Sequence, residues 1–95
     1  MNDALARPDD EVYRVRAAGV TWRQTDAEAV VLDLEESVYY GLNPSGTLLW
    51  KRLAEGATRQ DLIDMLIAGG APAEGASEDV DAFISELVSF GLLLR

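Results

Sequence analysis

Residues 28–43, EAVVLDLEESVYYGLN, hold two largely apolar segments of strand length on either side of an acidic pair. In residues 28–34 the side chains alternate, and one face is formed by Val30, Leu32 and Leu34. Residues 37–43 alternate in the same way, with Val38, Tyr40 and Leu42 on one face and Tyr39 and Gly41 on the other. An alternation of period two is typical of strands, and Glu35-Glu36 suits a tight turn, so the stretch predicts a β-hairpin.

A further strand is expected before this hairpin. Residues 11–18 alternate as a half-buried strand does, Gly19 interrupts the pattern, and residues 20–25 can continue it. The three predicted strands are consecutive, which favours an antiparallel meander in which residues 37–43 form an edge strand. Such an edge exposes unpaired backbone N–H and C=O groups.

Three helices are expected after the strands. Asn43 and Pro44 suit the N-cap and first position of the first helix, which Gly56 ends. Thr58 to Asp61 resembles a capping box for a second helix that runs to about residue 68. Residues 69–76 look like a small-residue linker, and Ser77 can cap a third helix that ends before Gly91. The order of elements predicts an α+β domain, with a three-stranded antiparallel meander followed by three helices.

The composition restricts the function. The chain has 95 residues, which fits one domain over residues 11–95 behind a polar, flexible segment at 1–10. It has neither cysteine nor histidine, so a thiolate site and the commonest general base and metal ligand are missing. We therefore expect a protein that is not an enzyme and that holds no metal or cofactor.

Charge and hydropathy also point away from two partner classes. The formal net charge of −9 disfavours binding to the phosphates of nucleic acids. No apolar run approaches the roughly 20 residues that cross a bilayer, and residues 1–10 lack a signal-peptide core, so we expect a cytoplasmic protein without a membrane partner.

The clustered carboxylates have structural explanations. Asp33, Glu35 and Glu36 fall near the predicted turn, where we expect a solvated hairpin end. The third helix carries acidic residues and no lysine or arginine. In addition, the predicted linker is longer than the roughly three- or four-residue turn of a helix-turn-helix, which further disfavours DNA recognition by that helix.

Polypeptide recognition remains. Residues 37–42 contain none of the lysine or proline that commonly blocks an edge strand, and an open edge can bind an extended peptide by strand addition. The third helix would supply the apolar wall of the binding groove. The candidate wall residues, each of which also suits a core position, are Val80, Phe83, Ile84 and Leu87.

The sequence from residue 28 onward also resembles the PqqD family, and most of all its stand-alone members associated with lasso peptide biosynthesis. The resemblance covers about residues 28–95 and depends on the order and spacing of several short motifs. These motifs are Leu32-Asp33, Tyr39-Tyr40-Gly41-Leu42-Asn43, Trp50, Gly56-Ala57-Thr58, Asp79-Val80 with Phe83-Ile84 and Leu87, and Gly91-Leu92. The alanine- and glycine-rich segment at 69–76 departs from the family pattern.

The resemblance implies a winged helix-turn-helix-like domain that binds the leader segment of a ribosomally made precursor peptide. The leader would add as a strand in a groove between the third strand and the third helix. The implied edge residues are Val38, Tyr39, Tyr40, Gly41 and Leu42, and the implied wall is the apolar set named above. From charge alone, we expect Asp79 and Asp81 to attract basic leader residues.

The implied partners are the precursor peptide, a cysteine-protease-like leader peptidase and an ATP-dependent cyclase. Two alternatives remain open. One is a PqqD-like chaperone for another modified peptide, such as the precursor of a quinone cofactor. The other is a small regulatory protein that uses the same fold.

Overall fold

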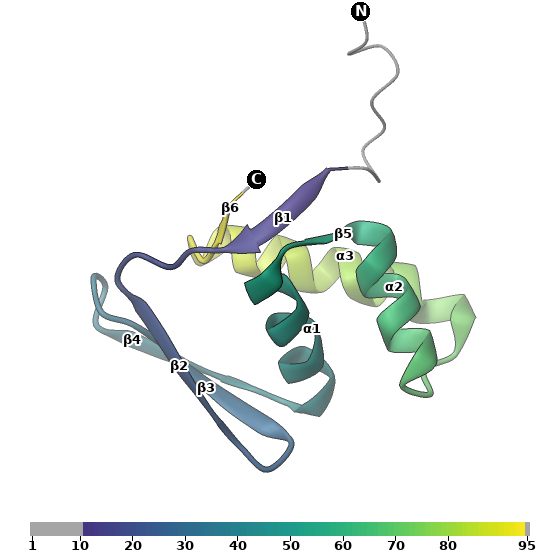
Figure 1. The fold of residues 1–95 in the computed structure, drawn as a ribbon, viewed down its shortest axis with the longest axis horizontal. Helices are drawn as coiled ribbons and strands as arrows, with labels where there is room; N and C mark the ends of the chain where they lie inside the picture. The colour runs from purple at the N-terminus through teal and green to yellow at the C-terminus, as the bar shows by residue number, and fades with distance from the viewer. Residues whose placement is uncertain (1–10, 95) are drawn as a thin grey trace, which may run out of the picture.

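A computed structural model describes residues 11–94, so the predicted flexible segment 1–10 lies outside the described residues, as does Arg95. The α+β class is confirmed. A three-stranded antiparallel sheet lies beside three helices, and α1 stands between this sheet and α2 (Figure 1).

The meander consists of β2 (Val20–Thr25), β3 (Glu28–Asp33) and β4 (Val38–Leu42), hydrogen-bonded in that order. The predicted hairpin is β3–β4, in which Val31 lies opposite Tyr40 and Leu32 opposite Tyr39. Its turn spans residues 34–37, with Ser37 at a positive φ of 57°. The hairpin prediction is therefore confirmed.

The prediction that residues 11–18 and 20–25 form one strand of the meander is wrong. β1 (Val12–Val15) leaves the meander and pairs with β5 (Ala57–Thr58) and β6 (Leu93–Leu94) in a second antiparallel sheet. The chain turns between the two sheets at Gly19, whose φ is +72°. A Cβ at Gly19 would lie 2.8 Å from the Glu35 side chain, so both the conformation and the space favour glycine.

The helices are α1 (Pro44–Glu55), α2 (Arg59–Ala68) and α3 (Ala73–Ser89). The predicted start of α1 is confirmed, because the Asn43 side chain accepts a hydrogen bond from the Gly46 N–H at 2.8 Å. The predicted capping box of α2 is also present between Thr58 and Asp61.

The predicted start of α3 at Ser77 is wrong. The helix begins at Ala73, directly after Pro72, and the link from α2 is residues 69–72. Four residues is the length found in helix-turn-helix motifs, so the linker-length argument against that motif fails. The buried Ala76 shows why the sequence misled: a small side chain that looks like linker composition packs in the core.

The core is centred on α1. Leu49, Trp50 and Leu53 are buried together with Leu62 of α2 and Val80 of α3. Trp22 of β2 meets Trp50 edge-on, with ring centroids 6.4 Å apart. The meander and the helices therefore share one core.

The buried face of β3 carries Ala29, Val31 and Asp33, while Val30, Leu32 and Leu34 are exposed on the opposite side. The prediction of a solvated hairpin end holds for Glu35 and Glu36, which are exposed, and is wrong for Asp33, which is 0% exposed. The reason is Arg16, whose guanidinium donates to the Asp33 carboxylate at 2.8 Å. A buried carboxylate with such a partner avoids the cost of an unpaired charge.

Candidate functional site

β4 forms an edge of the meander. It pairs with β3 along one margin, and no other strand among residues 11–94 pairs with its second margin. Tyr39 extends from this edge strand and is 73% exposed, which is unusual for a large aromatic side chain in a small domain.

A cavity of about 400 Å³ lies between β4 and α3. Its floor is apolar and belongs to the core, through Val31, Trp50 and Leu87. Phe90, just after α3, stacks on Tyr40 with ring centroids 4.5 Å apart and closes one end of the space. The residues of β4 that line it are Tyr39, Tyr40, Gly41 and Leu42.

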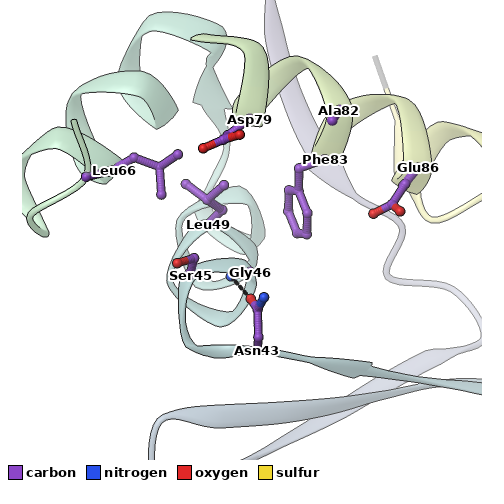
Figure 2. Close-up of a pocket in the computed structure, with 10 residues that line it drawn as sticks. Asn43, Ser45, Gly46, Leu49, Leu66, Asp79, Ala82, Phe83 and Glu86 are labelled. Atoms are coloured by element: carbon purple, nitrogen blue, oxygen red, sulfur yellow. Dashed lines mark hydrogen bonds between the residues drawn. The ribbon is translucent and has the colours of Figure 1, made fainter. Parts of the chain in front are cut away.

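A second cavity of about 320 Å³ continues along α3 toward the start of α1 (Figure 2). Phe83 and Glu86 line both cavities, so the two are neighbouring parts of one depression, which we call the α3 groove. The second part begins at Asn43, the residue that follows β4, and has Leu49 and Leu66 in its floor.

Gly46 shapes the contact between α1 and α3. A Cβ there would lie 3.3 Å from the Phe83 ring and 3.2 Å from the Asn43 side-chain oxygen, which is closer than ordinary contact. The absence of a side chain lets the Phe83 ring pack against the first turn of α1. The cap at Asn43 and the glycine three residues later thus position one wall of the groove.

The structure brings most of the predicted edge residues together with part of the predicted wall. Of the predicted site, the α3 groove is lined by Tyr39, Tyr40, Gly41, Leu42, Asp79, Phe83 and Leu87. Val38 lies on the edge strand but lines neither cavity.

Three predicted residues of α3 also lie outside the groove lining. Val80 is fully buried in the core, and Ile84 is half-buried against it. Asp81 binds Arg59 of α2 through two hydrogen bonds, at 2.7 and 3.0 Å. The Arg59 hydrogen bond is the main cause that holds the pKa of Asp81 below its ordinary value.

Helical spacing explains why some of the predicted α3 residues lie outside the groove lining. α3 buries one stripe, at Ala76, Val80 and Leu87, and turns a neighbouring stripe toward the groove, at Asp79, Phe83, Glu86 and Phe90. The groove stripe has the same three- and four-residue spacing but alternates acidic and aromatic side chains, so a search for apolar periodicity alone misses Glu86 and Phe90.

The charges near the groove have one sign. Asp79 and Glu86 are exposed, and neither carboxylate has a hydrogen-bond or ion-pair partner within residues 11–94. The described residues that line the two cavities include no lysine or arginine. Within the same part of the chain, no group of carboxylates converges in a way that could hold a metal ion. None of the helices in this part of the chain has both the length and the apolar character needed to span a membrane.

Comparison with known proteins gives two kinds of match. A family model described as coenzyme PQQ synthesis protein D (PqqD) matches residues 28–93. The structure of TbiB1 in complex with the TbiA(beta) leader peptide is similar, with 26% identity, 84% of this chain and 93% of that chain covered, and a TM-score of 0.76.

A structure described as lasso peptide synthetase B1 complexed with the leader peptide has 27% identity and a TM-score of 0.75. That comparison covers 87% of this chain and 98% of the other. No curated protein sequence matches this chain.

Proposed function

The chain belongs to the PqqD family, and on that premise we propose that it binds the leader segment of a ribosomally made precursor peptide and has no catalytic activity of its own. The leader adds as a strand along β4 and its side chains enter the α3 groove. The observation that carries the proposal is the unpaired margin of β4 beside an apolar cavity of about 400 Å³.

Strand addition supplies two separate contributions to binding. Backbone hydrogen bonds along the edge give affinity that depends little on sequence, and cavities beside the edge read alternate side chains. The proposal is supported by Tyr39, Gly41 and the Tyr40–Phe90 pair, which line the cavity beside the unpaired margin of β4. The two similar solved structures are both complexes with leader peptides, which supports this occupant.

The chemistry of the chain favours a binding role. Neither histidine nor cysteine is present in the sequence, and the two carboxylates of the groove are exposed to solvent. We propose that the chemical steps belong to partner proteins, a cysteine-protease-like leader peptidase and an ATP-dependent cyclase, to which this domain presents the leader.

The test is calorimetric titration with the leader peptide of the solved lasso peptide synthetase B1 complex. Tyr39→Ala should weaken binding about tenfold, because the exposed ring covers the added strand. Ile67→Ala is the matched control, since Ile67 is exposed on α2 and lines neither cavity. A proline inside the strand segment of the peptide should abolish binding by removing a backbone donor.

Equal affinities for wild type and Tyr39→Ala, with no effect of the proline, would refute strand addition along β4. Cleavage of the peptide by the purified domain alone would refute the non-catalytic role.

A second client class is favoured by the family description itself, which names the synthesis of coenzyme PQQ. Direct competition between a lasso leader and a quinone-cofactor precursor distinguishes the two clients, and the structures of leader complexes favour the former.

A regulatory role through DNA is disfavoured by α3, which carries acidic residues and no basic ones. A gel shift at low salt would reveal it.

A further inference from the structure

Beyond the end of β4, the α3 groove continues into its second cavity, which an added strand alone would leave empty. This part is lined by Asn43 and Gly46 of the α1 start and by Asp79, Phe83 and Glu86 of α3. Since Phe83 and Glu86 also line the β4 part, a peptide that leaves the edge strand passes directly over it.

We propose that the second cavity takes a basic side chain, arginine or lysine, from the peptide segment that flanks the added strand. This inference rests on the proposed function and specifies its ligand. It assigns Asp79 and Glu86 as the two carboxylates that recognise the charge, and Phe83 as the surface on which the alkyl chain or guanidinium lies.

The geometry of α3 fits this occupant. Figure 2 shows the Phe83 ring projecting toward the start of α1, with the carboxylates of Asp79 and Glu86 on either side of it. Residues seven positions apart on a helix are separated by about 10 Å along its axis, so the Phe83 ring has room between the two acceptors. A cationic group over an aromatic face, with a carboxylate within reach, gains from both interactions.

The floor of the cavity suits the methylene groups of a long basic side chain. Leu49 and Leu66 are almost fully buried there, and the small side chain of Ala82 fills little of the space. Lysine and arginine side chains bury an apolar stem and keep the charged end near solvent. A neutral apolar side chain would fill the same floor but would leave both carboxylates without a partner.

The charge balance excludes the opposite ligand. The lining includes no lysine or arginine among the described residues, and the chain carries a net charge of −9. An acidic side chain in this cavity would therefore face two like charges. Asp81 cannot share the task as predicted from sequence, because its carboxylate is bound by Arg59.

The experiment is a selection from a display library of random peptides of about 15 residues, with the full chain immobilised as bait. We expect enriched peptides to combine a strand-forming core with lysine or arginine at a fixed distance on one flank. For a strand added antiparallel to β4, that flank is the amino-terminal one. Peptides selected with the variant Asp79→Asn/Glu86→Gln as bait should keep the strand-forming core and lose the preference for lysine or arginine.

Glu74→Gln/Glu78→Gln is the matched control. Both residues lie on α3, are exposed, and line neither cavity, so the variant changes the net charge by the same two units. It should retain the basic enrichment. Calorimetry with an enriched peptide then compares the peptide with a version in which its basic residue is replaced by glutamine. This replacement should weaken binding to the wild type and to the control variant about fivefold. It should weaken binding to Asp79→Asn/Glu86→Gln much less.

The outcomes separate the two proposals. Enrichment of strand-forming peptides without a basic preference, or a preference lost equally in both double variants, would overturn the cationic subsite and leave leader binding intact. Failure to enrich any peptide would overturn both the proposed function and this inference.

Discussion

At the level of single side chains, Asp33 is a fully buried carboxylate with several hydrogen-bond donors around one of its oxygens. Its carboxylate accepts a hydrogen bond from Arg16 at 2.8 Å and bonds from the backbone N–H groups of Glu35 and Glu36 at 3.0 and 3.2 Å. It therefore holds the β3–β4 turn to the segment that follows β1. This turn sets the register of the strand that forms the proposed binding edge.

We expect Asp33→Ala to lower the free energy of unfolding by about 3 kcal/mol, the lower end for breaking a buried ion pair because Arg16 is partly exposed. Asp33→Asn keeps an oxygen for the turn N–H groups and should cost less. Urea denaturation of the three proteins checks the order. Equal losses in both variants would show that the charge, and not the turn, determines the effect.

The sequence could not reveal the burial of Asp33. Alternation along residues 28–34 separates two faces correctly, but the more apolar set, Val30, Leu32 and Leu34, lies on the exposed side. The deciding partner, Arg16, is 17 positions away in a loop. A local pattern carries no information about such a pairing.

At the level of secondary structure, the start of α2 shows a prediction that succeeded. The Thr58 side chain accepts from the Asp61 N–H at 3.1 Å, and the Asp61 carboxylate accepts from the Thr58 N–H at 3.0 Å. Thr58→Ala should cost about 1 kcal/mol, as is typical of a lost N-cap, while Thr58→Ser should be nearly neutral. Thermal unfolding followed by circular dichroism measures both, and a full loss with serine would contradict the capping role.

The ion pair between Arg59 of α2 and Asp81 of α3 contributes to stability with a pH dependence of known sign. The hydrogen bonds and charge of Arg59 lower the pKa of Asp81, so protonation is harder in the folded state than in the unfolded one. The contribution of the pair is complete above the ordinary carboxyl pKa and is lost as the pH falls through the lowered value. Because the pair is exposed, we expect at most about 1 kcal/mol.

The corresponding measurement compares wild type with Asp81→Asn in urea. The variant should be less stable at pH 7, and the difference should shrink toward zero near the acid end of the titration. A difference that stays constant across this range would exclude the ion pair as its cause. Peptide affinity at pH 7 should be unchanged, since Asp81 lies outside the groove lining.

The helices also show where sequence reasoning ends. Caps at Asn43 and Thr58 have local chemical signatures and were predicted correctly. The start of α3 was not, because Ala73 and Ala76 resemble a linker until the packing of α3 against the core is known. The edge strand at residues 38–42 followed from strand alternation and strand order, whereas the position of Glu86 and Phe90 beside the groove became visible only in the folded structure.

For the domain as a whole, the net charge of −9 predicts a salt effect on stability. At about 0.01 M salt the screening length is about 30 Å, comparable to a small domain, so the acidic residues repel one another across the molecule. At about 0.15 M salt it is about 8 Å. Relief of about 1 kcal/mol of repulsion would raise Tm by about 4–8 °C.

The exposed ion pairs oppose this trend because salt weakens them, but each contributes little. A melting series in sodium chloride therefore should show a rising Tm. Glu74→Gln/Glu78→Gln, whose net charge is −9 plus two, or −7, should show a smaller rise. A Tm that falls with added salt would mean that ion pairs outweigh the overall repulsion.

The class and the order of the main elements followed from the sequence, but the second sheet did not. β5 and β6 are two residues long, too short to produce a period, and their partner β1 lies at the far end of the described chain from β6. Only the folded arrangement of the helices brings the three strands together.

That arrangement has a consequence for the domain while it is being synthesised. Residues of β1 leave the ribosome before the other described strands and helices, yet Val15 pairs with Leu93 and Tyr13 belongs to a core that includes Leu92 and Leu93. The hairpins of the meander need only near neighbours and can form early. The wall built from α3 and Phe90 arrives last, so a nascent chain presents a strand edge without a groove beside it. If the proposed function holds, selective capture of a peptide must therefore wait until β6 has been translated.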